Sequence, residues 1–182
     1  MQLPINITKN LPYILAGIFC LMSTTCTSIS MEGKEWWIAK SLPIKTKDLL
    51  DSKLLLNLSL ILPFFLVSEV LLVIAVRPDF IELLWMLVIP VVLILFECVF
   101  GITVNLKMPV FDWENEVTIV KQSASSMIGS LAGFVMSLLC MVPVLLIPAA
   151  YGNLVKLAIC ILMLGLTGLL YKKNNAVNLQ EL

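Results

Sequence analysis

Five long apolar runs divide the chain, and they restrict its fold more than any other feature. A helix needs about 20 apolar residues to cross a hydrocarbon core about 30 Å thick. Hydrophobic residues make up 60% of the chain and charged residues 13%, more apolar surface than a soluble domain of this length can bury. The sequence therefore predicts an all-α integral membrane protein, one transmembrane domain over residues 1–182. The five expected spans cover residues 11–29, 54–76, 81–104, 126–147 and 154–171.

Two polar segments, residues 30–53 and 105–125, separate the spans and carry the information on orientation. The first holds five of the twelve basic residues. With residues 172–182, the two segments would put nine basic residues on one side of the membrane, against Lys9, Arg77 and Lys156 on the other. Because basic loops stay in the cytoplasm, we expect an outside N-terminus and an inside C-terminus. An odd number of spans without a signal peptide further suggests that preceding spans are missing.

Each polar segment is expected to form a helix along the inner membrane surface. In the first, Trp36 and Trp37 favour the headgroup level and predict a helix over about residues 32–41. Pro43 ends it, and a second helix begins near Thr46 and runs into the next span. In the second segment, Asp112 is a suitable N-cap for a helix over residues 113–121.

Two carboxylates, Glu69 and Glu97, fall within apolar runs. An ionisable side chain at membrane depth is a candidate functional residue. At 1.5 Å per residue, Glu69 would lie about 22 Å from the cytoplasmic start of its span, whereas Glu97 would lie about 10 Å from the cytoplasmic end of the next. A shared proton is therefore not expected. The alternative is that each carboxyl group faces a neighbouring helix or a hydrated cavity.

Small residues four apart begin the fourth span and predict close helix packing. The sequence alone does not say whether the partner helix belongs to the same chain. The ridge consists of Ser125, Gly129, Gly133 and Ser137.

The sequence contains no arrangement typical of an enzyme or a metal site. It has no histidine, and its five cysteines are scattered singly through apolar runs. No nucleophile elbow or phosphate-binding loop is present. We therefore expect no catalytic activity, cofactor or bound metal. The formal net charge of +0 gives no indication of a nucleic-acid partner, and none is expected.

Two stretches of the polar segments carry a resemblance to a known family. They read S-x-E-G-K-x-x-W-x-x-K-S-L-P-I-K-x-K-D-L-L-x-x-K from Ser30 and N-L-K-M-P-V-F-D-W-E-N-E-x-x-x-V-K-Q from Asn105. Together they resemble permease subunits of bacterial ATP-binding-cassette exporters of the type-2 export class. The chain is similar to the C-terminal portion of such a permease, and the resemblance implies the bacterial cytoplasmic membrane.

The resemblance implies a permease that is moved by a separate ATPase subunit. Another membrane chain is a candidate partner that would supply further spans in the lipid bilayer. The cytoplasmic segments would pass the motion of the ATPase to the spans. The candidate coupling residues are Glu32, Gly33, Trp37, Ser41, Leu42, Pro43, Pro109, Asp112, Trp113 and Lys121. For the tryptophans the alternative role is membrane anchoring. For the protein the alternatives are a small non-transporting scaffold or immunity-type protein that acts by helix packing, and, less well supported, an intramembrane enzyme using Glu69 or Glu97.

Overall fold

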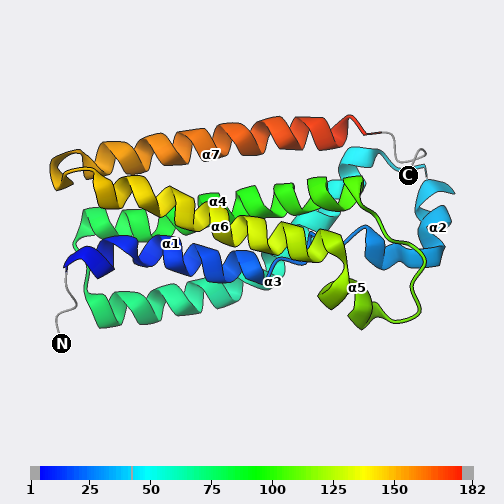
Figure 1. Ribbon diagram of the computed structural model, residues 1–182, viewed down its shortest axis with the longest axis horizontal. Helices are drawn as coiled ribbons and strands as arrows, with labels where there is room; N and C mark the ends of the chain where they lie inside the picture. Colours follow the sequence, from blue (N-terminus) through cyan, green and yellow to red (C-terminus); the bar gives the residue numbers. More distant parts are fainter. Residues whose placement is uncertain (1–4, 42, 178–182) are drawn as a thin grey trace.

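The computed structural model describes residues 5–41 and 43–177, and in this part of the chain all regular structure is helical. Five helices lie side by side in an elongated bundle (Figure 1). Four of them are long and apolar enough to cross a membrane, and the first is shorter. The chain is therefore an all-α multi-span membrane protein, as expected. The helices are α1 (Ile5–Leu21), α3 (Thr46–Val76), α4 (Phe80–Lys107), α6 (Ala124–Leu146) and α7 (Gly152–Asn175).

The short elements gather at one end of the bundle, which we call the polar end. They are the 3-10 helix η1 (Ser30–Glu35), α2 (Trp36–Ser41) and α5 (Glu116–Gln122), and they lie near the last turn of α7 (Figure 1). The opposite end, the turn end, holds the start of α1, the turn at residues 77–79 and the 3-10 helix η2 (Ala149–Tyr151). Both segments rich in polar residues therefore lie at the same end.

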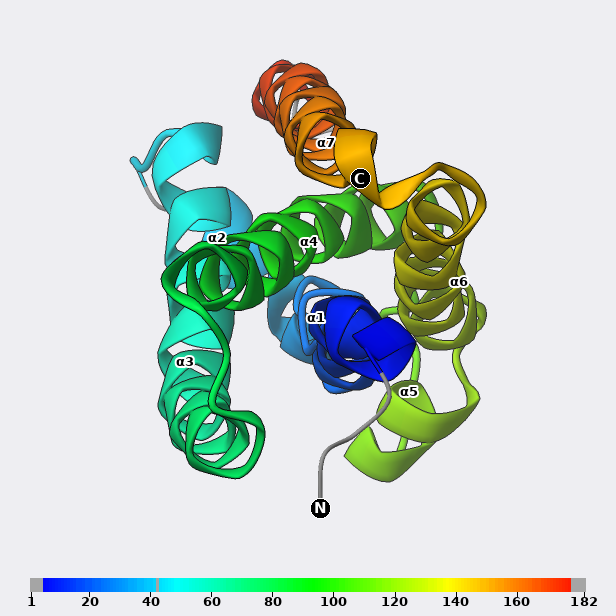
Figure 2. The same cartoon turned by 90° about the vertical axis from the view of Figure 1, so that its left-hand side faces the viewer.

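Helix α4 forms the centre of the bundle and contacts α1, α3, α6 and α7. Figure 2 looks along the bundle and shows α1 flanked by α3, α4 and α6, with one side open. Large side chains on the outer faces, such as Leu55, Phe64 and Leu71 of α3, are exposed. In a bilayer these faces would meet lipid, whereas most of α4 after its first turns is buried in protein.

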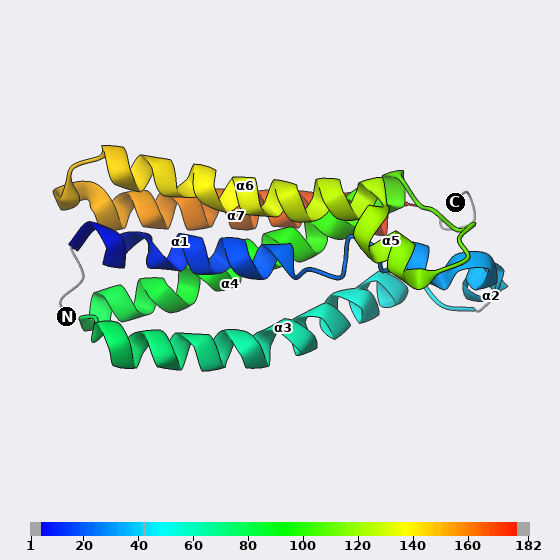
Figure 3. The same cartoon turned by 60° about the horizontal axis from the view of Figure 1, so that its bottom comes forward.

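The first span is shorter than the apolar run that predicts it. The expected helix covered residues 11–29, but α1 begins at Ile5 and ends at Leu21. Figure 3 shows α1 beside α6 and ending well before the polar end. Residues 22–29, which we call the irregular segment, continue as turns, although Thr25, Cys26 and Ile29 are buried. The apolar run therefore predicted the burial of this segment correctly, but it predicted a helix where the backbone is irregular.

The expected helix over residues 113–121 also needs correction. Helix α5 begins at Glu116, and its N-cap is Asn115, whose side chain accepts a hydrogen bond from the Val117 N–H at 2.9 Å. Asp112 instead forms an exposed ion pair with Lys34, at 3.4 Å. The side chains of Asp112 and Asn115 are both suitable N-caps. Asp112 remains outside the helix, where it contacts the first polar segment.

The expected interfacial helix over residues 32–41 is divided into η1 and α2. The chain is kinked within η1 at Gly33, whose φ of +57° lies in the left-handed region. Thr46 is the first residue of α3, and the N-cap position belongs to Lys45, which makes no side-chain cap. The predicted break between the two helices at Pro43 agrees with the gap between α2 and α3.

Candidate functional site

The interruption of the first span requires hydrogen-bond partners from other helices. Backbone groups outside a helix have no water to bond in the membrane interior, so protein must supply their partners. Asn57 of α3 supplies one, because its Oδ1 accepts hydrogen bonds from Thr24 N (2.8 Å) and Thr24 Oγ1 (2.9 Å). The Asn57 amide donates in turn to Cys98 Sγ at 2.9 Å. This buried asparagine holds the start of the irregular segment against α3 and α4.

Asn105, near the end of α4, holds the other end of the irregular segment. Its Oδ1 accepts from Ile29 N (2.8 Å) and Ser30 N (3.1 Å). Its amide donates to Ser30 Oγ (2.7 Å) and Ser125 Oγ (3.2 Å). Asn105 is fully buried, and its side chain is bonded at both the oxygen and the nitrogen. Sequence reasoning did not single out either asparagine, although an amide beside or within an apolar run was an available signal.

Glycines of α4 and α6 make room for the irregular segment. A Cβ added to Gly101 would lie 2.4 Å from Thr25 Oγ1, and one added to Gly129 would lie 2.3 Å from Cys26 Sγ. Only residues without a side chain permit this approach. The turn around Cys26 is therefore packed between two helix backbones.

The ridge on α6 packs entirely within this chain. Ser125 bonds Asn105, Gly129 meets Cys26, and a Cβ on Gly133 would lie 2.0 Å from Glu97 Oε2. Ser137 is buried and faces Gly17 of α1, where an added Cβ would lie 2.6 Å from Ser137 Oγ. The partners of the ridge are thus α1, α4 and the irregular segment, and the ridge is not a free surface for a second chain.

The Glu97 carboxyl group lies at the same level as this packing. Its Oε1 accepts a hydrogen bond from the Cys26 thiol at 3.4 Å, and its Oε2 has no hydrogen-bond partner among the described residues. Gly133 allows Oε2 to rest against the backbone of α6. In the described residues no group of three or more histidine, cysteine or acidic side chains is arranged to hold a metal ion.

Glu69 lies apart from this network. It is buried near the turn end of α3, and neither of its carboxylate oxygens has a hydrogen-bond partner among the described residues. It is seven residues from the helix end at Val76, about 10 Å, whereas Glu97 is about 26 Å along α4 from that same end of the bundle. The two carboxyl groups therefore occupy different levels.

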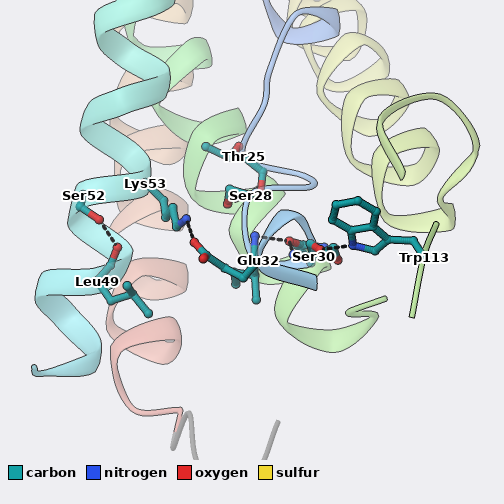
Figure 4. A network of polar contacts seen from close by, with 10 residues as sticks. Thr25, Ser28, Ser30, Glu32, Leu49, Ser52, Lys53 and Trp113 are labelled. Atoms are coloured by element: carbon teal, nitrogen blue, oxygen red, sulfur yellow. Dashed lines mark hydrogen bonds and ion pairs between the residues drawn. The ribbon is translucent and has the colours of Figure 1, made fainter. Parts of the chain in front are cut away.

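At the polar end, residues 30–36 and 110–113 pack together into a unit that we call the platform. It joins the two polar segments to the irregular segment. Trp113 Nε1 donates to the Ser30 carbonyl at 2.8 Å, and Ser30 Oγ accepts from Val110 N at 3.0 Å. The rings of Trp36 and Phe111 stack with centroids 5.4 Å apart. Figure 4 shows Trp113 directed at Ser30, and the ion pair between Glu32 and Lys53 that ties η1 to α3.

The structure divides the candidate coupling residues into two groups. Gly33 and Trp113 lie inside the platform, where a Cβ on Gly33 would meet the Trp113 ring at 2.9 Å, and Glu32 is paired within the chain. Leu42 lies outside the described residues. The remaining candidates are at least partly exposed: Trp37, Ser41, Pro43, Pro109, Asp112 and Lys121. The side chain of Trp37 is 66% exposed.

Replacing Trp113 with phenylalanine should lower the free energy of unfolding by about 1 kcal/mol. Phenylalanine keeps a ring over Gly33 but removes the donor that bonds the Ser30 carbonyl. The midpoint of thermal unfolding in detergent, followed with a thiol-reactive dye, measures the effect. Trp37→Phe is the matched control and should leave the midpoint unchanged, because the Trp37 side chain is exposed. Equal midpoints for the two variants would show that the hydrogen bond from Trp113 to Ser30 does not stabilise the contact between the platform and the irregular segment.

Residues 4–173 match the family described as "Membrane protein of 12 TMs". No curated protein matches the chain, and no solved structure does.

Proposed function

We propose that this chain, which belongs to the family of membrane proteins of 12 TMs, is a membrane-spanning permease subunit, or the C-terminal portion of one, in an ATP-driven exporter. The family description gives 12 spans, whereas five apolar helices lie in the described residues. In this proposal another membrane chain supplies further spans, and a separate ATP-binding-cassette ATPase drives the assembly. The protein itself carries out no catalysis.

The observation that carries the proposal is the platform. Its two polar segments are the same two that resemble exporter permeases. They are about 80 residues apart in sequence, and the hydrogen bond between Trp113 and Ser30 joins them in space. Ser30 belongs to both the platform and the Asn105 network. A displacement of the platform would therefore reach the irregular segment inside the bundle. This direct connection suits a protein that converts motion at its surface into motion of its spans.

The polar end is placed on the cytoplasmic side of a bacterial inner membrane in this proposal. It carries the lysine-rich segment and the Lys172 and Lys173 pair, which the positive-inside bias keeps in the cytoplasm. Beside Trp37 lies a hollow of about 310 Å³, lined also by Gly33, Trp36 and Phe111. An exposed indole next to a hollow is typical of the centre of a protein interface. We propose that the ATPase binds here.

A pull-down of the tagged protein from its native host, in mild detergent, tests the proposal. An ATPase subunit should be retained with the wild-type protein. Trp37→Ala should weaken binding of the ATPase about thirtyfold, because loss of a central interface tryptophan costs about 2 kcal/mol. The matched control is Tyr151→Ala, which removes an exposed aromatic side chain at the turn end and should change nothing.

The two possible failures of this test are distinct. If wild-type protein retains no ATPase, the exporter proposal is wrong. If the ATPase remains bound at wild-type levels in Trp37→Ala, the docking surface is wrong but the exporter proposal is not. The scaffold alternative has less support, because its proposed pairing surface, the ridge on α6, is occupied by residues of the same chain.

A further inference from the structure

A second polar hollow lies at the turn end, far from the platform and the Asn105 network. Its volume is about 390 Å³, at the small end of ligand sites. Residues from the start of α1, the start of α4, the end of α6 and the start of α7 line it, and Figure 2 looks onto this end of the bundle. Its charged side chains are Lys9, Asp79, Glu82 and Lys156.

Lys156 is the unusual member of this group, because only 5% of it is exposed. Its Nζ lies 5.9 Å from the centroid of the Trp85 ring, and within the described residues it forms no ion pair or hydrogen bond. The ring is held in place by a hydrogen bond from Trp85 Nε1 to Asn153 Oδ1, at 3.0 Å. The side chain as a whole is buried, but its Nζ is not among the buried polar atoms that lack a partner, so the ammonium group opens onto the hollow. An anion in the hollow that accepts its hydrogen bonds would stabilise it. Lys156 lines the hollow, so an anionic group bound there would supply the missing acceptor.

The balance of charge around the hollow restricts the ligand further. Two lysines and two carboxylates line it, so a simple anion would also meet Asp79 and Glu82, and a simple cation would meet the lysines. A zwitterion satisfies both pairs. Two ammonium groups facing one anionic group favour phosphate, which offers more acceptor oxygens than carboxylate. At the neighbouring end of α6, Leu145 and Ile147 line the hollow and Leu146 beside them is exposed, so acyl chains would have apolar side chains to pack against.

We propose that this hollow binds a phosphate group linked to a primary ammonium group, the chemistry of phosphoethanolamine. The phosphate would bond Lys156 and Lys9, and the ammonium group would face Asp79 and Glu82. The ligand is either the headgroup of phosphatidylethanolamine or the free zwitterion. This inference does not depend on the exporter proposal.

Native mass spectrometry of the purified protein in mild detergent tests the inference, with each lipid added in turn. Phosphatidylethanolamine should be retained about tenfold more strongly than phosphatidylglycerol, which lacks the cation, or phosphatidylcholine, whose quaternary ammonium donates no hydrogen bond. Soluble phosphoethanolamine that competes at equal concentration would identify the free zwitterion as the ligand. Failure to compete would identify the lipid.

Variants locate the binding to this hollow. Lys156→Met removes the charge but keeps an unbranched side chain, and it should reduce retention of phosphatidylethanolamine about tenfold. Lys156→Arg should retain it, and Lys172→Met, an exposed lysine at the other end of α7, is the control that should bind as the wild type does. Glu82→Gln should reduce the preference for phosphatidylethanolamine over phosphatidylglycerol even if Lys156→Met does not fold. Equal retention of the three lipids, no retention by the wild type, or an unchanged preference in Glu82→Gln would overturn the proposal.

Discussion

Replacing Asn105 with leucine should lower the free energy of unfolding by about 3 kcal/mol, a large effect for a side chain of the same branched shape. Leucine removes the oxygen that accepts from Ile29 N and Ser30 N, and it leaves two buried backbone donors without partners. Each unsatisfied donor costs about 1–3 kcal/mol. For a chain of this size the midpoint of thermal unfolding should fall by about 10 °C. The five cysteines are all buried, so reaction with a thiol-specific dye reports the transition.

A serine on the outer surface of the bundle provides the matched control. Ser59 is exposed on α3, and its hydroxyl donates to the Leu56 carbonyl of the same helix, at 2.7 Å. Ser59→Ala should therefore unfold at the wild-type temperature. If Asn105→Leu also unfolded there, the irregular segment would not depend on Asn105 for its backbone hydrogen bonds. Its attachment to α4 would then need another explanation.

The apolar runs predicted the helices of the bundle well because lipid imposes a simple requirement. A long apolar segment must satisfy its backbone internally, and a helix does so. The same reasoning failed at residues 22–29, where the protein interior supplies the partners instead. Asn57 and Asn105 are the residues that make the break possible, and they lie 33 and 76 positions from the atoms they bond. Local hydropathy contains no term for such distant partners.

The sequence predicted individual residues of the candidate site but not which residues they contact. The spacing of Gly129 and Gly133 indicated close packing, yet their partners are an irregular turn and a carboxyl group rather than a second smooth helix. Asp112 and Asn115 were equally suitable caps by residue type, and tertiary contacts selected Asn115. The hollow at the turn end was missed because Lys156 was counted only as a basic residue outside the membrane. Its burial becomes visible only when α1, α4, α6 and α7 meet.

Replacing Gly133 with alanine should lower the free energy of unfolding by about 2 kcal/mol. The added Cβ would lie 2.0 Å from Glu97 Oε2 and 2.5 Å from its Cδ, so a buried carboxyl group must move in a packed interior. The thiol-dye assay measures the loss. Gly165→Ala is the matched control, because nothing lies within 4 Å of a Cβ built there. Alanine at that position of α7 should be neutral or slightly stabilising, since it favours helix more than glycine does.

A double substitution separates packing within the chain from packing between chains. Glu97→Ala removes the group that the new methyl meets, so Gly133→Ala should cost almost nothing in that background. The coupling energy of the pair should then be about 2 kcal/mol, as for residues in direct contact. An equal cost of Gly133→Ala in both backgrounds would show that the methyl meets something other than Glu97. In that case the measurement would place other atoms against Gly133, and the packing assigned to Glu97 would be wrong.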